Sequence, residues 1–122
     1  MASVPYFLQL NAVLGAAGTG TLSFTVPKNE GLQLRQVRFS STGAFNVTDI
    51  RDSAGQHYTN ASSANPIPST ELQNAASANI GIQALDIELN LVGGVTFYVD
   101  LVDTSGAGNT VRVLFTGVRE LP

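Results

Sequence analysis

The feature of this sequence that most limits its fold is the alternation of apolar and polar residues along much of its length. Residues 21–26, 85–91, 95–101 and 111–115 each carry apolar side chains at every second position. A period of two residues is that of a β-strand, whose successive side chains point to opposite faces. No segment has the helical period, so the sequence predicts an all-β protein. The side chains predicted to face its core are Leu22, Phe24, Val26, Leu34, Phe39, Phe45, Val47, Ile87, Leu89, Phe97, Val99, Leu101, Val111, Val113 and Phe115.

The strands are short and are separated by turn residues, which is typical of a β-sandwich. The alternation changes parity across Arg35-Gln36 and again between Val47 and Ile50, as it does at a β-bulge or where a strand changes sheets. Residues 61–84 contain two prolines and much Ala, Ser and Asn, so they predict one long connection. About eight strands with one such connection predict an antiparallel β-sandwich of the single jelly-roll type.

The N-terminal segment, residues 1–19, is expected to be an arm or an edge strand that precedes the jelly-roll domain predicted for residues 20–122. Its apolar residues precede a glycine-rich joint at residues 15–20. Such a segment can fold back as an edge strand of its own domain, or it can extend the sheet of a neighbour. Folding back is favoured because exposed apolar segments promote aggregation. The partner-binding candidates in and around this segment are Tyr6, Phe7, Leu8, Arg35 and Arg38.

The two strands on either side of Gly93-Gly94 are predicted to form a hairpin. Both carry an apolar face, and these faces coincide in one sheet only if Leu91 pairs with Val95 across a three-residue loop. That loop places a glycine in the left-handed region. On the outer face, this register brings together four further candidates for partner binding: Asp86 opposite Asp100, and Glu88 opposite Tyr98. Like charges that lie directly opposite each other lower the stability of a sheet, so a partner or a cation could offset the repulsion between the two aspartates.

Composition narrows the class of protein. Charged residues make up 12% of the chain and the net charge is −3, with no basic run of the kind that nucleic-acid binding requires. Cysteine is absent, and no apolar run approaches the length of about 20 residues that spans a bilayer. No Lys or Arg precedes Lys28, whereas a secretory signal begins with a basic region, so we expect synthesis in the cytoplasm. A surface so poor in charge suits a protein that lies against another protein.

The sequence offers little catalytic chemistry. His57 is the sole histidine, Asp52 and nearby serines could form a triad with it only by chance, and no G-x-S-x-G elbow is present. We therefore expect a protein that is not an enzyme and that needs no cofactor. The acidic group formed by Asp86, Glu88, Asp100 and Asp103 has three interpretations: a solvated sheet face, a protein-binding surface, or a site for a hard cation. The solvated face is favoured, because no Ca²⁺-loop spacing supports a metal site.

Three stretches together resemble small virion structural proteins of tailed bacteriophages: AFNVTDIRDSAGQHY at 44–58, PIPSTEL at 66–72 and TVRVLFTGVREL at 110–121. In that class a strand ends in a D-S-x-G-x-x-Y/W turn, here residues 52–58, and a proline-rich connection follows. The last strand ends in a Gly-aliphatic-basic signature, here Gly117-Val118-Arg119. The resemblance covers about residues 20–121 and implies a single jelly roll.

Members similar to this chain serve as capsid decoration or cement proteins, or as head and tail accessories. The resemblance therefore implies a protein on the capsid surface of a virion that binds the major capsid protein and itself. A homotrimer is the preferred self-assembly and a dimer is the second possibility, because closed symmetry repeats one weak interface. The alternative function is a carbohydrate-binding or adhesion module of a phage tail, a fibre or a bacterial surface, with Tyr58 or Tyr98 as its sugar platform.

Overall fold

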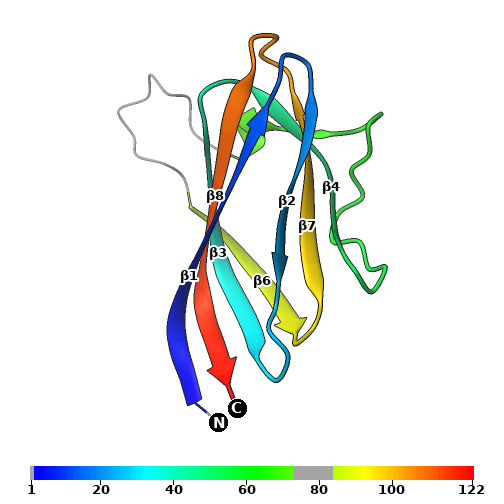
Figure 1. Ribbon diagram of the computed structural model, residues 1–122. Helices are drawn as coiled ribbons and strands as arrows, with labels where there is room; N and C mark the ends of the chain where they lie inside the picture. The colour runs from blue at the N-terminus through cyan, green and yellow to red at the C-terminus, as the bar shows by residue number, and fades with distance from the viewer. Residues whose placement is uncertain (1, 73–83) are drawn as a thin grey trace.

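Two four-stranded antiparallel sheets pack face to face in the computed structural model, which describes residues 2–72 and 84–122 (Figure 1). The strand orders are β1-β8-β3-β6 in one sheet and β2-β7-β4-β5 in the other. The elements are β1 (Ala2–Leu14), β2 (Thr19–Thr25), β3 (Gly31–Ser41), β4 (Phe45–Asp52), β5 (Ile67–Pro68), the 3₁₀ turn η1 (Ser69–Glu71), β6 (Ala84–Val92), β7 (Thr96–Asp103) and β8 (Asn109–Leu121).

The pairing is nested: β1 pairs with β8, β2 with β7, β3 with β6, and β4 with β5. This is the pattern of one long antiparallel ribbon that has been rolled up, and it defines a single jelly roll. Both chain ends lie at the same end of the sandwich, as Figure 1 shows. The predicted fold is confirmed.

The core lies between the sheets and is filled by the predicted inward side chains. All of them are buried except Phe24 and Ile87, which are partly buried and pack against the rest. Aromatic rings join the two layers: Phe97 on β7 meets Phe115 on β8 edge to face, with ring centroids 5.8 Å apart. The alternation of the sequence therefore translates directly into the two inner faces of the sandwich.

Both predicted changes of parity are β-bulges. The pairing of β3 shifts register between Leu34 and Gln36 against both of its neighbours, and the pairing of β4 with β7 shifts between Val47 and Asp49. At the first bulge the opposing residue is Gly117 on β8. A Cβ atom at this position would lie 1.9 Å from the carbonyl oxygen of Gln33. The bulge therefore brings two backbones so close that only glycine fits.

The predicted hairpin of residues 85–101 is wrong. β6 pairs with β3, where Leu91 lies opposite Leu32, whereas β7 pairs with β2 and β4 in the other sheet. The two apolar faces meet across the core from opposite sheets, so both point inward without sharing a face. Gly94 does adopt the left-handed conformation, with φ 87°. The predicted oppositions fail with the hairpin: Asp86 does not face Asp100, and Glu88 does not face Tyr98.

The N-terminal segment folds back onto its own domain. β1 pairs with β8 along its whole length of 13 residues and forms one edge of its sheet. Leu8 and Leu14 are buried, so β1 contributes to the same core as the later strands. Of the two arrangements that the sequence left open, the chain has the edge strand.

The long connection begins as predicted with little regular structure. It contains the two-residue strand β5 and the single 3₁₀ turn η1, while residues 73–83 lie outside the described residues. Ahead of this connection, Arg51 and His57 form one isolated β-bridge. Within the described residues, no helix is long and apolar enough to cross a membrane.

Replacement of Gly117 by alanine should be strongly destabilising, because the added methyl group must displace the backbone of β3. We expect the Gly117→Ala variant to lose about 3 kcal/mol of unfolding free energy, measured by urea denaturation. Gly15→Ala is the matched control, since no atom lies within 4 Å of a Cβ built there. The control should change stability by less than about 0.5 kcal/mol. Equal stability of the two variants would contradict the close approach.

Candidate functional site

The structure divides the nine predicted partner-binding residues among three environments. On the outer face of the β1-β8-β3-β6 sheet lie Phe7, Arg35, Arg38, Asp86 and Glu88, all exposed. On the outer face of the other sheet lie Tyr98 and Asp100, both partly buried. Tyr6 and Leu8 point toward the core. The residues therefore do not form one site.

On the outer face of the β2-β7-β4-β5 sheet, Asp100 is at the centre of a small polar network. Its carboxylate accepts hydrogen bonds from Arg51 Nε at 2.9 Å and from Thr21 Oγ1 at 2.8 Å. Desolvation raises the pKa of Asp100, but the hydrogen bonds from Arg51 and Thr21 outweigh it and leave the pKa below its usual value. The expected contact between two acids is thus replaced by an ion pair between neighbouring strands.

The guanidinium group of Arg51 also covers Tyr98. Its central carbon lies 4.4 Å from the ring centroid, a cation–π contact. Beside this network, His57 Nδ1 lies 3.0 Å from a carboxylate oxygen of Asp49. The aromatic face that a sugar would stack on is therefore already occupied on one side by Arg51.

The D-S-x-G-x-x-Y stretch forms a turn built around Asp52. One carboxylate oxygen of Asp52 accepts hydrogen bonds from the backbone N–H groups of Ala54 and Gln56, at 2.9 and 3.0 Å. The other oxygen accepts the phenolic O–H of Tyr58 at 2.6 Å. Gly55 is left-handed, with φ 88°, which explains the glycine of the motif. Asp52, considered from sequence as a catalytic partner of His57, instead holds the turn together.

This turn makes stability depend on pH in the alkaline range. Burial, together with the hydrogen bond to Asp52 and its charge, raises the pKa of Tyr58 from 10.0 to about 12. The folded state binds this proton more tightly, so the contribution is complete below pH 10 and is lost as the pH rises toward 12. The difference in phenolate absorbance between the wild type and Tyr58→Phe should titrate near pH 12. A midpoint near pH 10, the ordinary value, would contradict the contact.

A second buried carboxylate, Asp103, joins two loops at the end of the sandwich opposite the chain ends. It accepts hydrogen bonds from Ala17 N at 2.9 Å in the β1–β2 turn, and from Ser105 Oγ at 2.6 Å and Gly106 N at 3.2 Å in the β7–β8 loop. The nearby side chain of Asn109 holds the β3–β4 loop, where its amide donates to the carbonyl of Gly43 at 2.8 Å. Asp103, a candidate cation ligand from sequence, therefore has a structural role.

Asp103 should make the protein sensitive to acid. The hydrogen bond from Ser105, helped by backbone N–H groups, holds the pKa of Asp103 well below its usual value of 3.8. Stability is then complete above pH 3.8 and falls as the pH drops toward the folded-state pKa, because the unfolded chain takes up the proton first. Asp103→Asn should lower the urea midpoint at about pH 7 and weaken its decline below about pH 4. Glu88→Gln, at an exposed carboxylate, should do neither.

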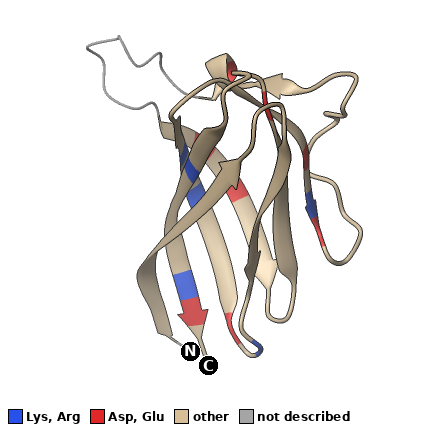
Figure 2. Cartoon of the chain, turned by 45° about the horizontal axis from the view of Figure 1, so that its top comes forward, with Lys and Arg blue, Asp and Glu red and all other residues tan. Residues whose placement is uncertain are grey.

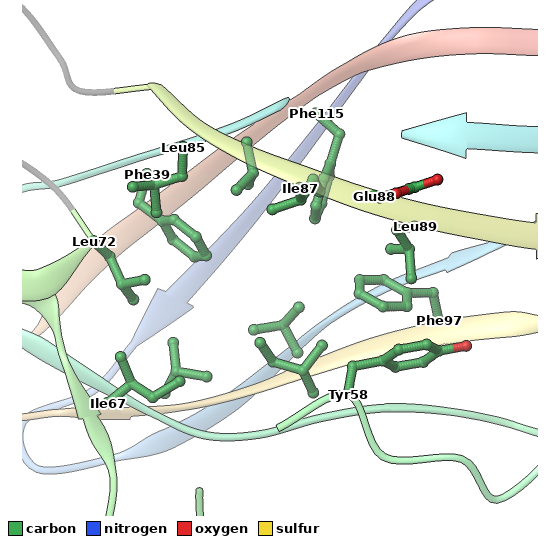
Figure 3. Close-up of a pocket in the computed structure, with 14 residues that line it drawn as sticks. Phe39, Tyr58, Ile67, Leu72, Leu85, Ile87, Glu88, Leu89, Phe97 and Phe115 are labelled. Carbon is green, nitrogen blue, oxygen red and sulfur yellow. The ribbon is translucent and has the colours of Figure 1, made fainter. Parts of the chain in front are cut away.

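Between the sheets lies an apolar cavity of about 270 Å³. Figure 3 shows side chains of both layers around it, among them Phe39, Leu85 and Ile87 on one side and Ile67 and Phe97 on the other. Its wall is continuous with the hydrophobic core. Of the polar residues at its wall, Glu88 turns its side chain to the outer face of the sheet, and the Tyr58 hydroxyl is already bound to Asp52. The cavity therefore offers few groups that could orient a polar ligand.

The outer face of the β1-β8-β3-β6 sheet carries an apolar strip, which we define as Pro5, Phe7, Leu114 and Val118. The side chain of Phe7 is 70% exposed although it lies in the middle of β1. Register places Pro5 opposite Val118, and Phe7 opposite Thr116 between Leu114 and Val118. Sequence reasoning missed Leu114 and Val118, although β8 visibly carries apolar residues at both parities. Pro5 and Phe7 are exposed and Leu114 and Val118 are partly exposed, so the strip presents apolar surface on a face that is not used by the core.

Comparison of the chain with protein-family models, with curated proteins and with solved structures found no match. Among residues 2–72 and 84–122, no three His, Asp or Glu side chains gather where they could hold a metal ion. Figure 2 shows how few and how scattered the charged segments are on the strands.

Proposed function

We propose that this protein is a non-enzymatic structural protein of a virion. In this proposal it is a capsid decoration or cement protein that is made in the host cytoplasm and binds the outer shell of a tailed-phage head as a homo-oligomer. The three sequence stretches that resemble such proteins support the proposal, and so does the jelly roll that the resemblance implied. Its partners are the major capsid protein and other copies of itself, and it needs no cofactor.

The observation that carries the proposal is the apolar strip. A sheet that buries one face in the core normally turns polar side chains to solvent on the other face. Here Phe7 stands exposed on that outer face, halfway along the edge strand β1, with Pro5 on its own strand and Leu114 and Val118 on the neighbouring one. Exposed aromatic and aliphatic side chains on a rigid sheet are typical of a surface that binds another protein.

The polar side chains support a structural role in a different way. Asp52 and Asp103 accept hydrogen bonds within or between loops, and Asp100 pairs two strands through Arg51. These groups fix the connections of the sandwich, so the surface that a partner meets is preorganised. Preorganisation reduces the entropy lost on binding, which favours stable docking on a large assembly.

The rival function, a carbohydrate-binding module, receives less support. Tyr98 has Arg51 against its ring, and Tyr58 packs against Phe97 with ring centroids 6.0 Å apart. A sugar platform needs an aromatic face that is open to the ligand. We therefore keep protein binding as the proposed activity.

A reconstitution experiment tests the function. Purified protein is mixed with undecorated heads assembled from the major capsid protein encoded with it, and occupancy is measured by co-sedimentation and electron microscopy. We expect saturable binding that raises the temperature at which heads disrupt, because each bound oligomer bridges capsid subunits.

The variant Phe7→Ser should reduce occupancy about tenfold or more, since it removes the most exposed aromatic side chain of the strip. Val92→Ser is the matched control, because Val92 is 68% exposed but lies at the far end of β6. Wild-type protein that neither binds nor stabilises the heads would refute the proposed function. Equal losses in the two variants would refute the role of the strip.

A further inference from the structure

The outward side chains of β8 follow a pattern that reverses along the strand. In chain order they are Arg112, Leu114, Thr116, Val118 and Glu120: basic, apolar, polar, apolar and acidic. Thr116 is the centre, and positions at equal distances from it are complementary. A strand that carries such a pattern matches a second copy of itself that runs in the opposite direction.

The basic end of the pattern has no acidic partner among the described residues of its own chain. Arg112 lies beside Asn11 on one side and Ser40 on the other, and neither Arg112 nor the adjacent Arg38 forms an ion pair within the described residues. A shallow hollow of about 190 Å³ lies between these two arginines, and Gln9 and Leu114 contribute to its wall. Two unpaired guanidinium groups around a hollow are suited to receive a carboxylate.

The acidic end carries a partly exposed carboxylate. Glu120 lies opposite Gly31 and accepts a hydrogen bond from the side chain of Gln33, so its second oxygen remains available. Arg112 and Glu120 are eight residues apart on one extended strand, about 27 Å, and cannot pair within a chain. An ion pair between them requires a second molecule.

β1 adds the apolar centre of the same face. Phe7 lies opposite Thr116, and its neighbours Pro5 and Gln9 lie opposite Val118 and Leu114. A two-fold axis over Phe7 and Thr116 would therefore place Phe7 against Phe7 of the second copy. The same axis would place each Leu114 against a Val118, next to the two ion pairs.

We propose that the outer face of the β1-β8-β3-β6 sheet binds a second copy of this chain in a two-fold, face-to-face dimer with antiparallel β8 strands. In this dimer Arg112 of each protomer binds Glu120 of the other, and the apolar strips pack between the two ion pairs. The inference deepens the proposed function and rests on it for the role of the strip, which it assigns to the contact between copies. The Phe7→Ser variant then occupies heads less because a monomer loses the avidity of the dimer.

The size of the face sets the expected affinity. Strands of 13 residues are about 40 Å long, and three neighbouring strands are about 14 Å wide, which gives about 550 Å² per protomer. A standard stable interface buries about 800 Å² per partner, so the dimer should dissociate in roughly the micromolar range. β6, the strand that carries Asp86, is two strands away from β8. Because the sheets are twisted, the corners of two sheets that pack face to face move apart, so β6 is left out of this area.

The symmetry of the face favours a dimer over the trimer expected from the class of protein. A two-fold interface uses the same patch on both protomers, so that patch must complement itself. A trimer joins two different patches and makes no such demand on either of them. The reversal of charge about Thr116 meets the demand of the two-fold interface.

A charge-reversal cycle tests the dimer, with the association constant measured by sedimentation velocity. Arg112→Glu and Glu120→Arg should each weaken dimerisation about tenfold or more, because each places like charges opposite one another twice. The double variant Arg112→Glu/Glu120→Arg should restore it to within about threefold, since the ion pairs re-form with exchanged signs. Circular dichroism and thermal unfolding verify that each variant is folded.

Lys28→Glu is the matched control, because it makes the same charge change at an exposed turn away from this face. It should leave the association constant within about twofold of the wild type. A wild-type monomer at all concentrations up to about 1 mM would overturn the proposal. So would a double variant as weak as the single ones, or a control as weak as Arg112→Glu.

The two proposals fail in different ways. A dimer that forms and responds to charge reversal, but does not bind heads, would refute the decoration function and leave the dimer face intact. Heads that bind protein shown to be monomeric would refute the dimer and leave the decoration function intact.

Discussion

The pairing of β8 along both of its edges is the constraint on which the rest of the structure depends. On one side β8 pairs with all of β1, and on the other side with β3. Because β1 and β8 are the first and last strands of the sandwich, this sheet closes only when distant parts of the chain meet. Non-local pairings of this kind make folding slow. The inner face of β8 supplies core side chains, and its outer face supplies half of the apolar strip.

Local patterns predicted most of the fold, and the choice of strand partners limited the prediction. Inward side chains and both β-bulges could be read from parity, because parity is a property of neighbouring residues. The pairing of Leu91 with Leu32 could not be read from parity. A hairpin with Val95 and a crossing between sheets both turn the two apolar faces inward. Whether residues join the same sheet or opposite sheets depends on hydrogen bonds to a third strand, here β3, which the alternation does not reveal.

The same limit explains which candidate residues were placed correctly. Asp52 and Tyr58 belong to a turn within seven residues of sequence, so their stretch was recognisable, although its hydrogen bonds were not. The ion pair of Asp100 with Arg51 joins strands that are far apart in sequence, so sequence suggested an acid, Asp86, in its place. The exposure of Phe7 follows from the register of β1 against β8. Leu114 and Val118 lie at the alternate positions of β8. The other positions of this strand had already been assigned to the core, so these two residues were missed.

The position of the chain ends has a consequence for the connectivity of the fold. Ala2 lies opposite Leu121 in the β1–β8 ladder, and both ends emerge at the same end of the sandwich. A short linker could therefore join them, and new ends could be opened in an exposed loop, which is how circular permutants are made. In such a permutant β1 and β8 would become a local hairpin with the same native contacts. The same architecture can thus be reached from several starting points of the chain. The order in which its strands can pair during folding, however, changes with the starting point.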